Sequence, residues 1–376
     1  MRIALRNRLA SLFGCLALAS CGAGVPAPRP PLFPQSPAWK TLLGEFVVPP
    51  LAADSRRVYV ATRDGAVRAL EQSTGSVIWK AEGVPGRLGA ADGFVLVRGE
   101  DGTLKCLQPR TGAVRWTAVT GVAGTLPAVL DQDLAFVAGR GLAAVELSSG
   151  RIVWTDASGA ETTAPPVSAG SRLLAGDADG LLRCRDRATG GTLWTLKTGG
   201  ALLAPPLVDR ERRRLYLGTT DKRILEVSLD KGKPGWSWRV GADVGHAGLL
   251  LPDRVLFPSY DAVVYALRRG GNLAWRGSLP SRPLSAPLPA GGYLVLACLE
   301  NELVALDPDT GVGAGSLRTG AEIRTPPLVA GGFVVLGLRD RSVIAYALPG
   351  TTVPAEATPE PPAPPAVPVA PPPPGR

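Results

Sequence analysis

The sequence predicts an all-β protein built as an eight-bladed β-propeller with four-stranded blades. Three observations carry this prediction: a tryptophan that returns at an interval near 40 residues, a fixed order of turn motifs within each interval, and incomplete units at the two ends of the array. A persistent period of this length is typical of repeat architectures with one supersecondary unit per period. Since one four-stranded unit cannot bury both of its faces, neighbouring units are expected to stack radially into a closed ring.

The tryptophans provide the clearest signal. Seven of the eight share one register, with steps of 37 to 42 residues, and they are Trp39, Trp79, Trp116, Trp154, Trp194, Trp236 and Trp275. One further step reaches Gly315, the only position of the register without an aromatic ring, which predicts an empty slot that the ring of blades tolerates. A side chain repeated once per blade meets a structural demand, so we interpret these residues as packing residues of the repeat rather than as a ligand cage.

Each interval contains four short apolar runs separated by turn residues, as in the unit formed by residues 164–167, 172–176, 181–185 and 191–197. Asp-Gly at 64–65, 101–102 and 179–180 is typical of tight hairpin turns, and Thr-Gly at 74–75, 111–112, 189–190 and 310–311 places glycine at a left-handed position. The apolar second strand recurs eight times, with equivalent residues at Tyr59, Leu96, Phe136, Leu173, Tyr216, Leu256, Val295 and Val335. The count of blades is therefore eight.

The two ends of the array complement each other. The last unit supplies three strands between residues 325 and 348, whereas residues 37–44 form a tryptophan-containing strand with no blade in front of it. We therefore predict that residues 37–44 are the outermost strand of blade eight. The predicted propeller domain spans residues 37–348, and its ring is closed by pairing the two ends of the chain.

The N-terminus carries the features of an export signal. Arg2, Arg6 and Arg8 precede an apolar stretch that is too short to span a bilayer, and Leu18-Ala19-Ser20-Cys21 follows. This tetrapeptide resembles the bacterial lipobox, which implies a lipoprotein signal peptide at residues 1–20 and diacylglycerol and palmitate-type acylation of Cys21. Gly22 in the next position favours sorting to the outer membrane. The alternative is an ordinary secretory signal in which Cys21 is coincidental.

Two further segments flank the predicted propeller. Residues 21–36 are rich in proline and are expected to form a semi-extended tether. Residues 349–376 consist mostly of Pro and Ala, which predicts a disordered tail with polyproline II character; a groove-binding ligand motif is the alternative. No other segment is apolar and long enough to cross a membrane as a helix.

Composition and charge limit the classes of partner. With 46 Gly, 37 Pro and a hydrophobic content of 45%, the 376 residues describe a turn-rich globular protein. The formal net charge is +9, and removal of the signal segment with its three arginines leaves +6. The densest basic run, residues 210–214, lacks the interleaved aromatic side chains that stack on bases. We therefore predict a solvated turn there and no nucleic-acid partner.

The order of motifs resembles the pyrroloquinoline-quinone-type propeller repeat. Pro-Pro, a short β run, Asp-Gly followed by an apolar strand, and Thr-Gly before tryptophan occur in residues 48–79 and 164–194, and without tryptophan near 285–311. Combined with the lipobox and eight blades, the chain is similar to the lipoproteins that assemble outer-membrane proteins. The resemblance implies a lipid-anchored, periplasm-facing scaffold in the outer membrane that binds the β-barrel insertion machinery and holds no cofactor.

Enzymatic alternatives find little support in the residues. Quinoprotein dehydrogenases of this fold are longer and stack the quinone on adjacent cysteines, whereas Cys106, Cys184 and Cys298 stand far apart and are predicted to be small buried fillers. His246 is the only histidine, which argues against zinc-protease and multi-histidine metal motifs. No Gly-x-Ser-x-Gly motif accompanies it, so we predict a surface-loop or capping role for His246.

The Asp-x-Asp segments at 177–179 and 307–309 lack the distal glutamate of a calcium loop and are interpreted as hairpin turns. The sequence therefore predicts neither an enzyme nor a metal site. Two alternative functions remain open: a small quinoprotein-like or ligand-binding propeller, and a cell-envelope adhesion or polysaccharide-associated module.

The predicted strand order also assigns charges to the two faces of the ring. Turns between second and third strands carry mostly acidic residues, and these are Asp64, Asp101, Asp179, Asp221, Asp261, Glu300, Glu302 and Asp340. Turns at the opposite ends carry mostly basic residues, and these are Arg56, Arg57, Arg172, Arg212, Arg213, Arg214, Lys231, Lys233, Arg268 and Arg269. We expect a modest charge polarity across the ring, which would orient it toward a charged partner or membrane.

Overall fold

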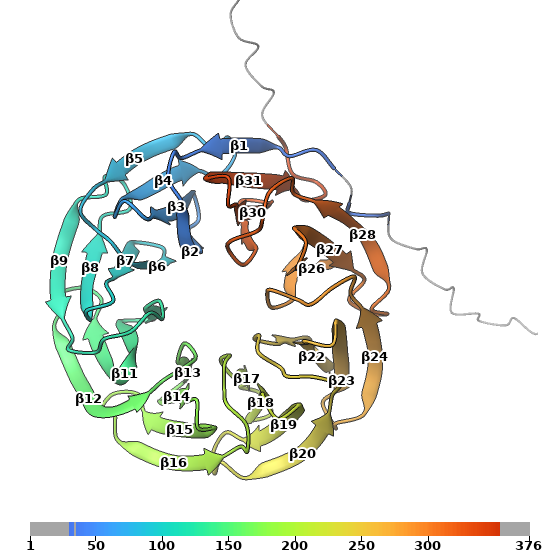
Figure 1. The fold of residues 1–376 in the computed structure, drawn as a ribbon. Coiled ribbons are helices and arrows are strands. Elements are labelled where there is room, and N and C mark those ends of the chain that lie inside the picture. The colour runs from blue at the N-terminus through green and yellow to red at the C-terminus, as the bar shows by residue number, and fades with distance from the viewer. Residues whose placement is uncertain (1–29, 34, 354–376) are drawn as a thin grey trace, which may run out of the picture. The chain divides into compact units, whose positions relative to one another are not determined.

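The computed structural model describes residues 30–33 and 35–353, except for the side chains of residues 157–160. The predicted signal peptide, Cys21 and most of the predicted tether and tail lie outside the described residues. The described part of the chain contains 31 β-strands and no helix. Figure 1 shows these strands arranged as blades in a closed ring, with successive blades following the chain around it.

The strands fall into eight sheets. Blades one and two consist of β2 (Val47–Ala53), β3 (Arg57–Thr62), β4 (Val67–Glu71) and β5 (Val77–Ala81), then β6 (Arg87–Ala91), β7 (Phe94–Arg98), β8 (Thr103–Leu107) and β9 (Val114–Val119). Blades three and four consist of β10 (Val129–Asp131), β11 (Leu134–Glu146) and β12 (Ile152–Glu161), then β13 (Val167–Ala169), β14 (Arg172–Gly176), β15 (Leu181–Asp186) and β16 (Thr192–Lys197).

The second half of the ring repeats this plan. Blades five and six consist of β17 (Leu207–Asp209), β18 (Arg214–Thr219), β19 (Arg223–Ser228) and β20 (Pro234–Arg239), then β21 (Leu249–Leu250), β22 (Arg254–Ser259), β23 (Val263–Arg268) and β24 (Leu273–Ser278). Blade seven consists of β25 (Leu288–Ala290), β26 (Tyr293–Cys298), β27 (Glu302–Leu306) and β28 (Gly313–Arg318). Blade eight consists of β29 (Leu328–Ala330), β30 (Phe333–Gly337), β31 (Ser342–Ala347) and β1 (Trp39–Leu42).

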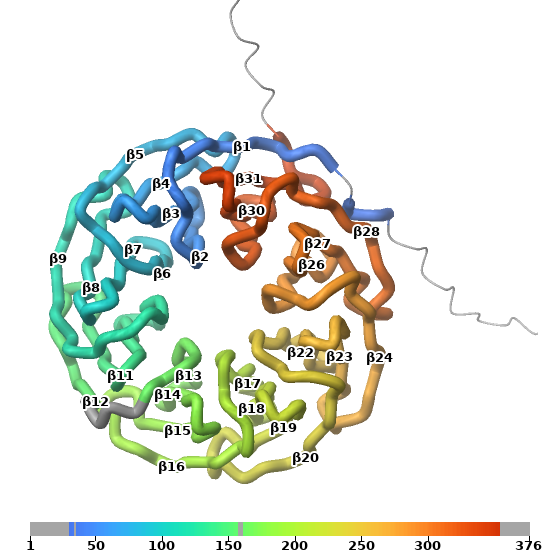
Figure 2. The backbone as a smooth tube through the Cα atoms, viewed as in Figure 1, coloured from blue at the N-terminus to red at the C-terminus, as the bar shows by residue number. Residues whose placement is uncertain are grey.

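The ring closes through the pairing of the two ends of the array, as the sequence predicts. Strand β1 runs antiparallel to β31, with Trp39 opposite Ala345 and Leu42 opposite Ser342. The Nζ of Lys40 donates to a carboxylate oxygen of Asp340 at 2.7 Å across the same pair of strands. Figure 2 shows the blue N-terminal segment beside the red C-terminal blade. The predicted fold class, an eight-bladed propeller closed by an N-terminal strand, is confirmed.

Blade three departs from the others because its second and third strands form one continuous element, β11. The amide of Leu147, which follows β11, donates to the carbonyl of Asp133, which precedes it, at 2.9 Å. The two ends of β11 therefore lie side by side, so this strand folds back on itself. Gly141, with a φ of 119°, provides the left-handed conformation at the reversal. Blade three thus contains four antiparallel segments like its neighbours.

The core consists of apolar side chains that interlock between adjacent blades. All eight residues predicted as equivalent positions of the second strand are fully buried. Val58, Val60 and Leu70 of blade one, for example, pack with Val335 and Val343 of blade eight in one buried cluster. Because each blade shares its buried faces with two neighbours, no blade forms a core of its own, which agrees with the behaviour expected of a repeat array.

The expectation of an empty slot at Gly315 is wrong. The ring of Phe33 from the N-terminal segment is 1% exposed and belongs to the buried cluster between blades seven and eight. The amide of Leu32 donates to the carbonyl of Ala314 at 2.8 Å, and a Cβ on Gly315 would stand 2.1 Å from the carbonyl oxygen of Phe33. The chain therefore fills the gap in its own tryptophan register with a phenylalanine that precedes the first blade.

Candidate functional site

The seven register tryptophans lie at the seams between neighbouring blades. Each indole Nε1 donates to a backbone carbonyl in the following blade, and the acceptors are Gln72, Pro109, Leu147, Arg187, Leu229, Arg269 and Pro308, at 2.8 to 3.2 Å. Each ring also packs against a glycine of that blade, as Trp39 does against Gly75, where a Cβ would stand 2.4 Å from the ring. The structure therefore distributes these residues around the ring and does not bring them together as one site.

The three cysteines of the propeller are free and buried. Cys106 and Cys184 lie directly opposite Trp116 and Trp194 on neighbouring strands, a position that alanine holds in blades one and six. Burial raises the pKa of Cys106 and Cys184 to about 11 and that of Cys298 to about 12. Thiols of this kind stay protonated near neutral pH and are poor nucleophiles.

His246 lies half-buried between blades six and seven. Its Nε2 is 3.1 Å from the carbonyl oxygen of Pro283, and its ring meets Tyr260 edge-on, with centroids 5.5 Å apart. The guanidinium of Arg282 lies over the ring of Tyr260, 3.6 Å from the ring centroid. Burial lowers the pKa of His246, with the charge of Arg282 acting in the same direction. This stack joins two neighbouring blades through a histidine that is neutral at pH 7.

Within the described residues, no three metal-ligating side chains are grouped in a way that could hold a metal ion. The same part of the chain also contains no helix with the length and apolar character that a membrane crossing needs. Two recesses between blades one and two, at opposite ends of strand β3, are candidate sites within the described residues.

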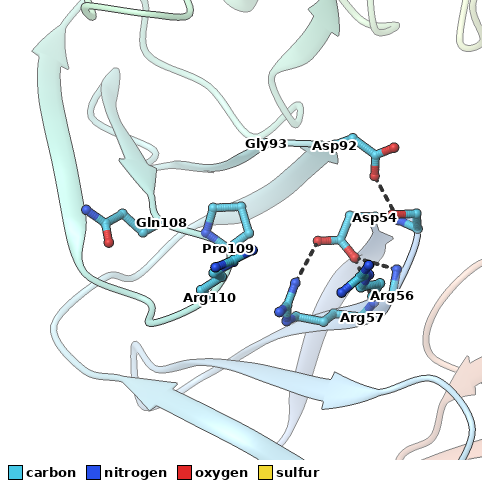
Figure 3. A pocket seen from close by; sticks show the side chains of 9 residues that line it. Asp54, Arg56, Arg57, Asp92, Gly93, Gln108, Pro109 and Arg110 are labelled. Atoms are coloured by element: carbon cyan, nitrogen blue, oxygen red, sulfur yellow. Dashed lines mark hydrogen bonds and ion pairs between the residues drawn. The ribbon is translucent and has the colours of Figure 1, made fainter.

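The first of these, the Arg110 recess, has a volume of about 470 Å³ and lies beside the turns at the N-terminal end of β3. Its lining consists of Asp54, Ser55, Arg56, Arg57, Asp92, Gly93, Gln108, Pro109 and Arg110. Figure 3 shows Asp54, Arg56 and Arg57 on one side of it and Pro109 and Arg110 on the other. The side chains of Arg56 and Arg110 are exposed and form no ion pair with any described residue. They are free to contact a partner.

Asp54 organises the wall of the Arg110 recess. It accepts from the amides of Arg56 and Arg57 at 2.8 and 2.7 Å, and from the hydroxyl of Tyr59 at 2.5 Å. Burial by itself would raise the pKa of Asp54, but these hydrogen bonds and the charge of Arg57 outweigh it and hold the pKa below the usual value. Burial, together with the bond to Asp54, raises the pKa of Tyr59 strongly. The pair therefore keeps one proton on the tyrosine and the negative charge on the aspartate.

The second, the Arg63 recess, lies at the C-terminal end of β3 and has a volume of about 760 Å³. Its lining consists of Val47, Val48, Pro49, Thr62, Arg63, Pro85, Gly86, Arg87, Val97, Gly99, Glu100, Asp101, Thr103, Lys105 and Arg324. Blades one and two supply most of these residues, and Arg324 comes from the connection between blades seven and eight. Four cationic side chains thus face two carboxylates in a recess whose volume falls within the roughly 300–1,000 Å³ typical of ligand sites.

Arg98 lies behind the Arg63 recess and carries a buried charge. Its side chain is 1% exposed, and it donates to the carbonyls of Val122, Gly124 and Leu126 at 2.7 to 2.8 Å. No carboxylate among the described residues pairs with it. Burial, and then the like charge of Arg87, lower the pKa of Arg98 to about 10 against the opposing effect of Asp101, so Arg98 remains cationic at neutral pH.

Part of the expected basic face is neutralised by neighbouring acids. Arg213 and Arg172 both pair with Asp230, and Arg214 pairs with Glu226 at 2.9 Å. The dense basic run at residues 210–214 therefore forms part of an ion-pair network on the ring. Exposed pairs of this kind contribute little stability, and they reduce the charge available to a partner.

The geometry defines the class of this protein: an eight-bladed propeller of the pyrroloquinoline-quinone type whose blades are joined by tryptophan–glycine seams. A profile of the family described as outer membrane protein assembly factor BamB matches residues 35–92, 63–178, 138–257 and 260–371. These matches cover most of the ring. The chain belongs to the outer membrane protein assembly factor BamB family.

Curated relatives carry the same description. The chain is 30% identical over 198 residues to the outer membrane protein assembly factor BamB of Alkalilimnicola ehrlichii, covering 49% of this chain and 50% of the relative. It is 27% identical over 157 residues to that of Nitrosomonas eutropha, covering 41% of this chain and 36% of the relative. The chain thus spans about half, or less, of the length of the curated relatives it matches.

Solved structures share the fold over nearly all of their length. BamB from Moraxella catarrhalis superposes with a TM-score of 0.67 at 20% identity, covering 83% of this chain and 99% of that one. The computationally designed Ika8 protein gives 0.72 at 16% identity, covering 84% and 100%, and the C-terminal WD40 domain of Sif2 gives 0.71 at 10%, covering 84% and 98%. These similarities show the propeller fold.

Sequence reasoning missed the two recesses and the role of Phe33. The arginines that line the recesses carry no periodic signal, because they come from unrelated turns and strand ends of blades one and two and from the connection between blades seven and eight. One signal for Phe33 was present: the missing tryptophan at Gly315 leaves a gap that an aromatic residue near either end of the chain could fill.

Proposed function

We propose that this protein is a lipid-anchored scaffold that faces the periplasm and takes part in the assembly and insertion of outer-membrane β-barrel proteins. The observation that supports this function is membership of the assembly-factor family over matches that extend from residue 35 to residue 371. A closed eight-bladed ring presents two rigid loop faces, and rigid surfaces bind protein partners with a small loss of conformational entropy.

The proposed scaffold acts by binding rather than by catalysis. The described thiols are buried and protonated, and the only histidine is neutral and packed between an arginine-covered tyrosine and a carbonyl. The partners we propose are proteins of the outer-membrane assembly machinery. We expect no nucleic-acid partner, because Arg213 and Arg214 of the densest basic run pair with Asp230 and Glu226.

The proposed anchor is Cys21, acylated after removal of residues 1–20, with residues 21–36 as the tether. Three acyl chains hold a protein on a membrane far more firmly than the single chain that binds only marginally. A Cys21→Ala variant should incorporate no labelled palmitate and should fractionate away from the outer membrane. A Cys15→Ala variant is the matched control and should be labelled like the natural chain; labelled Cys21→Ala protein would contradict the anchor.

The assembly role is tested in a strain that lacks this protein. We expect several outer-membrane barrel proteins to fall in amount together and to recover when the natural chain is restored. Tagged protein should also co-purify with the barrel-insertion machinery from solubilised envelopes. Normal barrel-protein levels in the deletion strain, together with no co-purification, would overturn the proposed function.

A further inference from the structure

The strongest unexplained feature outside the blade seams is an excess of positive charge at the inner end of blade two. Arg87 and Arg98 lie directly opposite each other in the register of β6 and β7, so one antiparallel pair carries two guanidinium side chains at neighbouring positions. Like charges at such positions destabilise a sheet. Burial of a cation without an ionic partner lowers the stability of the fold by a larger amount. Three backbone carbonyls offset part of this cost for Arg98, and an anion bound from outside would offset more of it.

The two arginines have different roles. The terminal nitrogens of Arg98 are fixed by three carbonyls of the loop at residues 122–126, and Arg98 does not line the Arg63 recess. Arg87 lines the recess: it donates through one terminal nitrogen to the carbonyl of Pro49 at 2.7 Å, and its Nε is buried without a hydrogen-bond partner. Arg98 therefore supplies a fixed positive charge behind the lining, and Arg87 supplies a positive charge in the lining itself, with only one of its terminal nitrogens bonded to the protein.

Two other cations face the same space. Arg63 is exposed, forms no ion pair with the described residues, and lies over the ring of Phe46 at 5.9 Å. Lys105 donates to the carbonyl of Gly83 at 3.0 Å and forms no ion pair with the described residues, although its charge helps to lower the pKa of Asp101. Arg324 is the exception, since it pairs with Glu322 at 3.0 Å. Of the four lining cations, Arg63 and Arg87 thus have no carboxylate beside them among the described residues.

The acids of the recess offset only part of this positive charge, since Asp101 interacts electrostatically with Lys105 and with Arg98 but forms an ion pair with neither. Asp101 accepts from the amide and hydroxyl of Thr103 at 2.9 and 2.8 Å, which lowers its pKa and holds it against its own turn. Glu100 is exposed and forms no ion pair within the described residues. Apart from Thr62 and Thr103, the remaining lining consists of valine, proline and glycine, with Val47, Val48 and Val97 among them. Cationic donors interleaved with apolar side chains suit a polypeptide that carries carboxylates better than they suit a lone inorganic anion.

We propose that the Arg63 recess binds a carboxylate-bearing segment of a partner protein, with Arg63 and Arg87 as the donors to its carboxylates. Guanidinium groups bind carboxylates through two parallel hydrogen bonds, and such bonds are about twice as strong as neutral ones. The recess lies at the end of β3 opposite the Arg110 recess, so this site occupies one defined face of the ring. The proposal does not depend on the assembly role, because it rests on charges within this chain.

The test measures binding by calorimetry to the purified full chain at low salt. The probes are a capped tetraglutamate peptide, a capped tetraglutamine peptide of the same length, and inorganic phosphate. We expect the tetraglutamate peptide to bind and the tetraglutamine peptide not to bind, with affinity that falls as salt rises. Binding of phosphate alone, or of no probe, would overturn the proposal.

The variants locate the site. Arg63→Gln combined with Arg87→Gln should weaken tetraglutamate binding at least about ten-fold, as expected from the loss of charge-assisted hydrogen bonds. Arg56→Gln combined with Arg110→Gln removes the same charge from the opposite recess and should change affinity less than about two-fold. Arg63→Gln alone, at an exposed side chain, keeps the test valid if loss of the Arg87 bond to Pro49 disturbs folding. Equal affinities in all variants would place the site elsewhere.

Discussion

Replacement of Phe33 by alanine should destabilise the whole ring, although Phe33 precedes the first blade. The side chain is 1% exposed, and its ring meets Tyr346 edge-on with centroids 6.2 Å apart. Truncation of a buried phenylalanine costs about 3–5 kcal/mol, of which an aromatic pair of this geometry contributes about 0.5–1.5 kcal/mol. If the segment simply detaches, the lost burial still costs about 1.5–3 kcal/mol.

The measurement is urea unfolding followed by tryptophan fluorescence, which reports on the blade seams. Leu42→Ala is the matched control, because Leu42 lies on the closing strand β1 but is 74% exposed, and it should change stability by less than about 0.5 kcal/mol. Gly315→Ala should disrupt the same contact, because its Cβ would clash with the backbone of Phe33.

The double variant completes the cycle. Once Phe33→Ala has released the N-terminal segment, the new Cβ of Gly315→Ala no longer clashes with the backbone of residue 33. The double variant should therefore lose less stability than the sum of the losses in the two single variants. Fully additive losses, or a loss below about 1 kcal/mol for Phe33→Ala, would refute the conclusion that Phe33 fills the eighth slot of the register.

Three further predictions concern the seams, the thiols and Asp54. In urea unfolding, Trp194→Ala should lower the free energy of unfolding by about 3 kcal/mol. Trp194→Phe should lower it by about 1 kcal/mol, the value of the lost hydrogen bond to the carbonyl of Leu229. No loss of stability in Trp194→Phe would show that the indole nitrogen contributes nothing. In a full chain with Cys15 and Cys21 replaced by alanine, Ellman's reagent should detect no thiol in the folded protein and three in the denatured protein. The reason is that Cys106, Cys184 and Cys298 are buried, which raises the pKa of each thiol. Rapid reaction of the folded chain would contradict this. The folded pKa of Asp54 lies below the usual 3.8, so its contribution to the free energy of unfolding is complete above about pH 5 and is lost as the pH falls through that folded pKa. Asp54→Asn should therefore destabilise the protein at pH 7 and show a smaller further loss of stability between pH 5 and 2 than the natural chain. An unchanged acid dependence of the unfolding midpoint would count against this prediction.

The number of blades and the closure of the ring follow from the sequence for a local reason. Each blade is a run of consecutive hairpins, so its turn glycines and its tryptophan recur with the chain and appear as a period. Trp39 without a blade, and a last unit without a fourth strand, identify the closing pair by elimination. The seams were predictable as packing sites for the same reason, although the carbonyl acceptors in the next blade were not.

Tertiary structure alone decided where Phe33 packs, where Arg87 meets Arg98, and where the recesses lie. Phe33 reaches Gly315 across most of the chain, and Arg324 joins residues of blades one and two only because the ring is closed. The cross-strand pairing of Arg87 with Arg98 depends on the register of β6 and β7, and a shift of one residue would separate them. Such contacts occur once and without a period, because they arise from where the ring brings distant residues together and not from any pattern repeated along the chain.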